Sequence, residues 1–132
     1  MSIDLGTFDH VHVNVSNRIE AQQWYSSIFG LYPTESLAFW AKDGGPLTLQ
    51  NTPGSIHIAL FQSKLIQNTT IAFRVSASGL RGAIKFLASI GVSIKPVDHE
   101  VSWSIYFKDP DGNPFEVTTY DYEAFANQPA FT

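Results

Sequence analysis

Cysteine is absent from the 132-residue chain, so the sequence offers neither a disulfide framework nor a thiolate site. Basic residues are also scarce, eight Lys and Arg against twelve Asp and Glu, and they form no cluster. The formal net charge is −4 at pH 7. This balance argues against nucleic acid and anionic membranes as partners, because both attract basic surfaces.

Long apolar runs are missing as well. No stretch approaches the roughly 18 residues that a membrane-spanning helix needs. Residues 1–5 lack the basic and apolar regions of a signal peptide, so we expect a cytoplasmic protein with no membrane partner. Apolar side chains make up 44% of the chain and include ten Phe, which is enough for the core of a single domain over residues 1–132.

The first half of the chain begins with a strand pattern. Residues 8–15 alternate apolar and polar side chains, which predicts a strand with one core face. The other face carries His10, His12 and Asn14. A polar strand face of this kind lies toward solvent or toward a cavity.

A helix and further strands follow in the first half. Asn17 is a candidate N-cap for a helix over about residues 18–29, and Gly30 is a typical helix stop. Turn residues then divide the rest into segments with strand patterns. We expect strands at 37–41, 47–50 and 55–61, with turns at 43–45 and 51–54.

The second half repeats this order. A strand pattern covers residues 70–75, and Ser78 is a candidate cap for a helix that ends at Gly91. We expect extended chain at 93–97 and a strand at 101–107, followed by the turn 109–113 and a strand that carries Glu116; the tail from 121 has no clear period.

Corresponding features of the two halves are about sixty residues apart. The offset matches His10 with Thr70 on the first strands, and His57 with Glu116 on the last. We therefore predict an α+β protein of two tandem βαβββ modules, residues about 8–62 and 69–121, packed about a pseudo-twofold axis.

Such an axis brings equivalent polar positions around one centre. His10, His57 and Glu116 would form a set of two imidazoles and one carboxylate, which leaves positions on a metal ion open for water or substrate. This donor set suits Fe(II), Mn, Ni, Co or Zn. The alternatives are ordinary hydrogen-bonded strand histidines and a carboxylate paired with Arg74 or a hydroxyl.

Several motifs resemble the vicinal oxygen chelate superfamily, which includes glyoxalase I, fosfomycin-modifying enzymes, extradiol dioxygenases and bleomycin-binding proteins. The resemblance covers about residues 8–122. The motifs are Asp9-His10-Val11, Phe29-Gly30-Leu31, the strand from Ser102 to Phe107, the turn from Asp109 to Asn113, and Glu116.

The resemblance implies a curved mixed sheet around a cavity, with the helices on its outer face, and a homodimer. It also implies that His10 and Glu116 are metal ligands. The histidine that usually opens the second module falls on Thr70, a poor ligand for a divalent ion. The metal site therefore depends on His57 taking the place of that histidine, and without it the protein has kept the fold and lost the metal.

Other polar residues have candidate roles in the cavity. Tyr106 and His99 are candidate acid–base groups, with a cavity-lining aromatic and an exposed loop histidine as the alternatives. His12 is expected to line the cavity rather than bind metal, because adjacent inward positions on one strand do not easily reach one ion. Candidate substrate-binding residues are His12, Asn14, Thr70, Arg74 and Thr118. Phe39, Trp40 and Phe61 are candidates for an apolar pocket or for the core.

Two functions follow from these expectations. The first is a divalent-metal-dependent enzyme of the glyoxalase or dioxygenase type, acting on a small oxygen-chelating substrate. The alternative is a metal-free protein that sequesters a small molecule, of the bleomycin-resistance type. Thr70 is the feature that favours the alternative.

Overall fold

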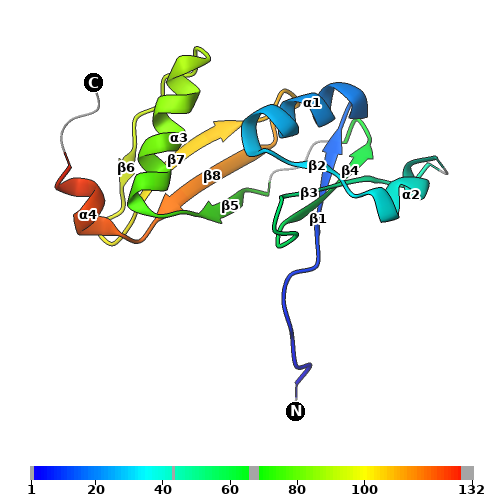
Figure 1. The fold of residues 1–132 in the computed structure, drawn as a ribbon, viewed down its shortest axis with the longest axis horizontal. Helices are drawn as coiled ribbons and strands as arrows, with labels where there is room; N and C mark the ends of the chain where they lie inside the picture. The colour runs from blue at the N-terminus through cyan, green and yellow to red at the C-terminus, as the bar shows by residue number, and fades with distance from the viewer. Residues whose placement is uncertain (1, 43, 66–68, 129–132) are drawn as a thin grey trace. The chain divides into compact units, whose positions relative to one another are not determined.

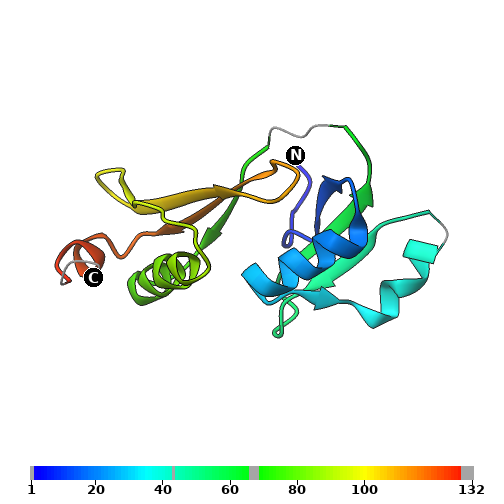
Figure 2. The same cartoon turned by 90° about the horizontal axis from the view of Figure 1, so that it is seen from above.

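The computed structural model describes residues 2–42, 44–65 and 69–128. The chain divides into two compact units, residues 1–67 and 68–132, and each unit has its own four-stranded sheet (Figures 1 and 2). This confirms the α+β prediction of two modules. That the two form one domain around a common cavity stays a prediction. No helix among the described residues is both long and apolar enough to cross a membrane.

The first unit has the strand order β1-β4-β3-β2, in which β1 pairs with β4 in parallel and the other pairs are antiparallel. Its elements are β1 (Val11–Val15), α1 (Arg18–Phe29), β2 (Tyr32–Pro33), the 3-10 helix η1 (Glu35–Leu37), α2 (Ala38–Lys42), β3 (Leu47–Gln50) and β4 (His57–Gln62).

Helix α1 has the predicted ends. The Asn17 side chain accepts hydrogen bonds from the amides of Ile19 and Glu20, and Gly30 adopts the left-handed conformation with φ +66°. The helix buries Ala21 and Tyr25 against one face of the sheet. The buried sheet residues on that face are Val13, Val15, Leu49, Ile58 and Leu60. The alternation seen in residues 8–15 is therefore confirmed from Val11 onward.

The second unit has the strand order β5-β8-β7-β6, again with a parallel pair, β5 with β8. Its elements are β5 (Ile71–Arg74), α3 (Ala77–Ser89), β6 (Val97–Asp98), β7 (Trp103–Lys108), β8 (Pro114–Thr119) and α4 (Tyr122–Ala126). Helix α3 buries Leu80, Ile84 and Leu87 and contacts β7 and β8 (Figure 1).

The cap of α3 differs from the prediction. The side chain of Ser76, not Ser78, accepts a hydrogen bond from the amide of Gly79, and the Ser78 hydroxyl contacts that of Ser76 instead. The Asp121 carboxylate accepts a further bond from the amide of Ala77. Asp121 begins the tail for which the sequence predicted no structure. In the structure this tail contains α4, and Asp121 directly precedes that helix.

Residues 37–41 do not form the predicted strand, since they belong to η1 and α2. The Arg18 guanidinium donates hydrogen bonds to the carbonyls of Ala41 and Gly45, which satisfies acceptors at the end of the short helix. Of the turn predicted at 43–45, residue 43 lies outside the described residues. The sheet edge is formed instead by β2, which pairs with β3.

The pairing register corrects one predicted equivalence. Val11 lies opposite Ile58 in the first unit, and Ile71 lies opposite Phe115 in the second. If the first residues of β1 and β5 correspond, then Ala59 is the counterpart of Glu116. The predicted match of His57 with Glu116 is thus wrong by two residues. A shift of two leaves the side chain on the same face, so the alternating pattern could not detect it.

Candidate functional site

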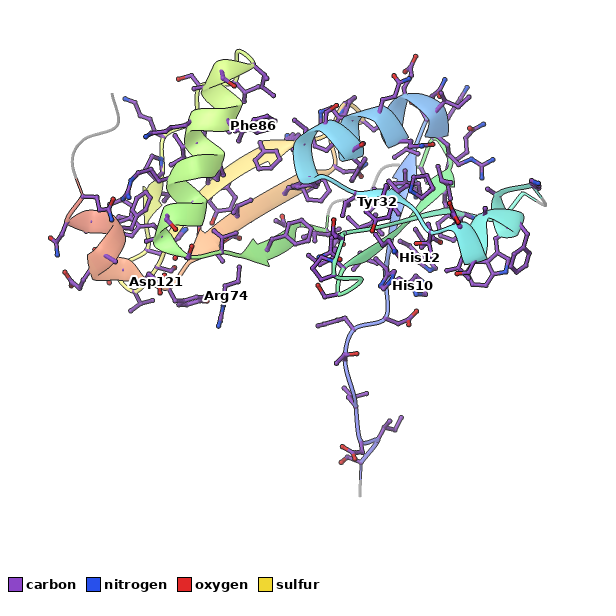
Figure 3. The ribbon with its side chains drawn as sticks, viewed as in Figure 1. His10, His12, Tyr32, Arg74, Phe86 and Asp121 are labelled. Atoms are coloured by element: carbon purple, nitrogen blue, oxygen red, sulfur yellow. The ribbon has the colours of Figure 1, made fainter. Side chains whose placement is uncertain are left out.

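The first unit brings two imidazoles together just before and within β1. The Nε2 atoms of His10 and His12 are 2.8 Å apart, and their rings stack with centroids 4.8 Å apart (Figure 3). The two imidazoles thus lie close together, and the expectation that His12 lines the cavity rather than binds metal stays a prediction. His10 precedes the first residue of β1, so the pleat does not fix the direction of its side chain.

Asp9 orients the His10 ring. Its Oδ2 atom lies 2.6 Å from Nδ1 of His10. Since an ionised carboxylate only accepts hydrogen bonds, Nδ1 carries the proton. In the neutral ring, Nε2 then carries the lone pair and accepts a hydrogen bond from Nε2 of His12. A carboxylate on the other ring nitrogen is also found in metal-binding histidines.

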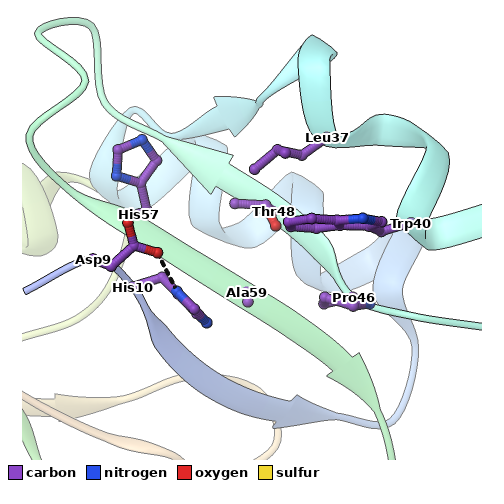
Figure 4. Close-up of a pocket in the computed structure, with 8 residues that line it drawn as sticks. All are labelled: Asp9, His10, Leu37, Trp40, Pro46, Thr48, His57 and Ala59. Atoms are coloured by element: carbon purple, nitrogen blue, oxygen red, sulfur yellow. Dashed lines mark hydrogen bonds and ion pairs between the residues drawn. The ribbon is translucent and has the colours of Figure 1, made fainter.

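A pocket of about 130 Å³ lies in the same unit, under α2 (Figure 4). His10 and His57 both line it, and Ala59 forms part of its floor. The lining residues are Asp9, His10, Leu37, Trp40, Pro46, Thr48, His57 and Ala59. Two of the three predicted metal ligands thus lie at one pocket, whereas the third, Glu116, belongs to the second unit.

Glu116 lies in the middle of β8 and is half-buried. The Ser104 hydroxyl lies 2.8 Å from Oε2 of Glu116 and 2.9 Å from Oγ1 of Thr118, so its one hydrogen is shared between two acceptors. Thr118 in turn donates to the carbonyl of Trp103. In this structure the partner of the carboxylate is therefore a hydroxyl, and Thr118 is held within the same network.

Tyr106 lies directly opposite Glu116 in the register of β7 and β8. Its hydroxyl is 2.9 Å from Nε2 of His99, so the structure brings together the two candidate acid–base residues. Loss of surrounding water, followed by the negative charge of Glu116, raises the pKa of the Tyr106 phenol. The phenol is therefore protonated at neutral pH and can donate a hydrogen bond.

The remaining predicted site residues lie at the edges of these faces. The Arg74 guanidinium carbon lies 4.6 Å from the centre of the Tyr120 ring, and Arg74 pairs in register with Thr118 (Figure 3). Thr70 is exposed just before β5. In the first unit the Asn14 side chain donates to the carbonyl of Leu65.

Within either unit, the described residues include no group of three His, Cys, Asp or Glu placed to hold a metal ion. The set of His10, His57 and Glu116 draws on both units and stays a prediction. Sequence reasoning missed Asp9 and Ser104 as direct partners of His10 and Glu116. The signals for them were present, since Asp9 adjoins His10 and Ser104 shares a strand face with Tyr106.

Comparison with known proteins finds a matching family model and several solved structures with a similar fold. Residues 7–117 match the model of the Glyoxalase/Bleomycin resistance protein/Dioxygenase superfamily. An integron cassette protein from the mobile metagenome of the Halifax Harbour sewage outfall is 29% identical, with a TM-score of 0.66 and coverage of 86% of this chain and 97% of that one.

Two further solved structures share the fold at lower identity. A putative glyoxalase family protein from Bacillus anthracis is 22% identical, with a TM-score of 0.67 and coverage of 91% of this chain and 99% of that one. The fosfomycin resistance protein FosX from Listeria monocytogenes, complexed with Mn(II) and sulfate, is 17% identical, with a TM-score of 0.64 and coverage of 92% and 96%.

Proposed function

Because the chain belongs to the Glyoxalase/Bleomycin resistance protein/Dioxygenase superfamily, we propose that it is a divalent-metal-dependent enzyme acting on a small substrate with neighbouring oxygen atoms. One observation carries the proposal: His10 and His57 line the same pocket, and a carboxylate oxygen of Asp9 lies 2.6 Å from Nδ1 of His10. Neutral, oriented imidazoles are the preferred nitrogen ligands of such ions.

In this proposal His10, His57 and Glu116 hold the ion. Nitrogen and carboxylate donors suit Mn, Fe(II), Co, Ni and Zn, and the Mn(II) in the FosX structure makes manganese the first ion to test. A bound ion would act as a Lewis acid on the substrate oxygens. His12, whose Nε2 atom adjoins that of His10, lies beside this set.

The chain's own residues have separate tasks in the proposed reaction. Asp9 keeps the lone pair of His10 at Nε2, and Ser104 holds one oxygen of Glu116. Tyr106 donates its phenol hydrogen to an oxygen of the substrate, and His99 exchanges a proton with that phenol. Substrate contact by Arg74, Thr118, Thr70 and Asn14 belongs to the same proposal.

The experiment is a measurement of metal content in protein purified without chelators. We expect stoichiometric divalent metal in the wild type, and its loss in His10→Ala, His57→Ala and Glu116→Gln. Asp9→Asn should weaken metal binding by about 10–100-fold, the range for residues that orient a ligand. His99→Ala is the matched control, because it removes an imidazole outside the proposed set. Metal absent from every preparation, or retained by all three ligand variants, contradicts the proposal.

The second candidate is a metal-free binding protein. Two features favour it: Thr70 stands where the resemblance implies a histidine, and the Glu116 carboxylate already has the Ser104 hydroxyl as partner. Such a protein would bind its ligand equally well with and without a chelator. Calorimetry under both conditions separates the two functions.

A further inference from the structure

We infer that the first unit contains a subsite for one uncharged, ring-sized apolar group, with the Trp40 indole as its wall. The inference rests on the proposed function and deepens it by naming a class of substrate. That class is a compound in which a single apolar ring lies next to the oxygens that the proposed metal would chelate.

The size of the pocket limits its occupant. Its volume is about 130 Å³. Apolar cavities of roughly 150 Å³ in proteins bind benzene, whereas pockets for drug-sized ligands measure about 300–1,000 Å³. The pocket therefore matches one six-membered ring in volume. Ala59, which is 1% exposed, provides the room because its side chain is a single methyl group.

The lining has two chemically different sides. In Figure 4, Leu37, Trp40 and Pro46 lie on one side, and the imidazoles of His10 and His57 lie on the other, beside Asp9. Among the described residues that line the pocket, none is Lys or Arg. An anionic group on the apolar side would therefore have no cation to pair with. An uncharged ring fits that side, and its oxygen substituents fit the side with the histidines.

The backbone that carries the indole has several hydrogen bonds. The Trp40 carbonyl accepts a hydrogen bond from the amide of Gly45 at 2.9 Å, and a Cβ atom at position 45 would lie only 2.8 Å from that carbonyl oxygen. Arg18 clasps the same turn through the carbonyls of Ala41 and Gly45. Trp40 is 42% exposed, so much of its apolar surface faces water although its backbone is braced.

A neighbouring aromatic residue shows that exposure alone does not define the subsite. Phe39 is 54% exposed and its ring centroid lies 5.5 Å from that of Trp40, yet it does not line the pocket. Phe39 therefore provides a matched control. Both residues lie on α2, and only Trp40 should affect ligand choice.

The test compares two acids that share a chelating group. Mandelate and lactate both carry a hydroxyl beside a carboxylate, and they differ in a phenyl ring against a methyl group. Calorimetric titration of the Mn(II)-loaded protein should show mandelate binding at least about tenfold more tightly than lactate, within the range for discrimination by a hydrophobic pocket. Trp40→Ala should remove this preference and leave lactate affinity unchanged. Phe39→Ala should keep the preference, and Trp40→Phe should keep most of it.

A second variant tests the bracing without touching the indole. Gly45→Ala should reduce mandelate affinity and spare lactate, because the new Cβ displaces the Trp40 backbone. Equal binding of the two acids, equal effects of Trp40→Ala and Phe39→Ala in proteins with wild-type circular dichroism, or no binding of either acid at millimolar concentration overturns the subsite. Repeating the titrations in EDTA separates it from the proposed function. A Trp40-dependent preference that persists without metal supports the subsite and contradicts metal dependence, whereas loss of all binding on chelation supports both.

Discussion

The two units of the chain share a plan but present different polar faces. Each pairs its first strand in parallel with its last, and each packs one long helix against the apolar face of the sheet. On the polar face, Ala59 in the first unit corresponds to Glu116 in the second. The methyl group leaves space for a pocket, whereas the carboxylate fills its position and needs a hydrogen-bond donor.

The difference shows how one scaffold can divide the parts of a site. The first unit supplies imidazoles and a pocket, and α2 occupies the connection before β3. In the second unit the hydroxyl of Ser104 is hydrogen-bonded to that of Thr118. The connection before β7, which matches the one that contains α2, carries His99. Neither unit contains a complete metal-binding group among its described residues. Because the cores of the two units are alike, equivalent core mutations should destabilise both units to a similar extent. Mutations outside the cores should affect the two units differently.

The largest expected effect tests the likeness of the cores. Ile58 and Phe115 occupy corresponding positions and are 1% and 0% exposed. Truncation should cost about 3–5 kcal/mol for Phe115→Ala and about 2–5 kcal/mol for Ile58→Ala, because each leaves a cavity. Urea denaturation measures both. A loss below about 1 kcal/mol in one unit alone would show that its core is not packed like the other.

Much of this plan was predictable because strands and helices have simple periods. The alternation from Val11, the Asn17 cap and the Gly30 stop are local features, and each is confirmed. Turn residues also marked the connection at 51–54, where the amide of Gly54 bonds to the carbonyl of Asn51.

What could not be predicted depends on contacts distant in the chain. Phe39 and Trp40 are aromatic residues, which are enriched in strands. In the structure they lie in a short helix whose end is stabilised by hydrogen bonds from Arg18. The pairing register of β4 with β1 shows that the counterpart of Glu116 is Ala59, whereas the sequence pattern had suggested His57. The sequence suggested the histidines of the pocket and offered Trp40 as a pocket or core residue, but it did not indicate the short helix α2 or the place of Ala59 in the lining.

The next effect concerns the corresponding turns before β4 and β8. Asp109 is 4% exposed and accepts hydrogen bonds from the amides of Asp111 and Asn113 and from the Asn113 side chain. Asp109→Ala leaves these donors without their acceptor and should cost about 1–3 kcal/mol.

The counterpart in the first unit should cost less. Asn51 accepts from the amides of Ser55 and Ile56 in a more open turn, so water can replace its side chain in Asn51→Ala. We expect about 0.5–1.5 kcal/mol by thermal or urea unfolding. If Asn51→Ala lowered the free energy of unfolding as much as Asp109→Ala or more, burial would not explain the contribution of these turns to stability.

An effect of similar size to that of Asn51→Ala, and smaller than that of Asp109→Ala, compares the caps of α1 and α3. Asn17 accepts from two amides, while Ser76 accepts from one and the Asp121 carboxylate takes the amide of Ala77. Each substitution to Ala should cost about 0.5–2 kcal/mol, with Asn17→Ala the greater. Asp121→Ala combined with Ser76→Ala should close the gap, and unfolding midpoints provide the measurement. A larger loss for Ser76→Ala alone would rule out this ranking.

The smallest effect is a shift in titration on the polar face of the second unit, where the ionisable Tyr106 occupies the position that Thr48 has in the first unit. The pKa of Tyr106 is raised by loss of water and by Glu116, so Glu116→Gln should lower that pKa toward its ordinary value of about 10. The raised pKa stabilises the fold fully below about pH 10, and this contribution disappears as pH rises through the pKa of the folded state. Tyr122, whose pKa is raised chiefly by its hydrogen bond to Asp98, is the control. In NMR titrations of labelled tyrosine rings only Tyr106 should respond to Glu116→Gln; an unchanged Tyr106, or an equal shift at Tyr122, would mean that Glu116 does not act on the phenol opposite it.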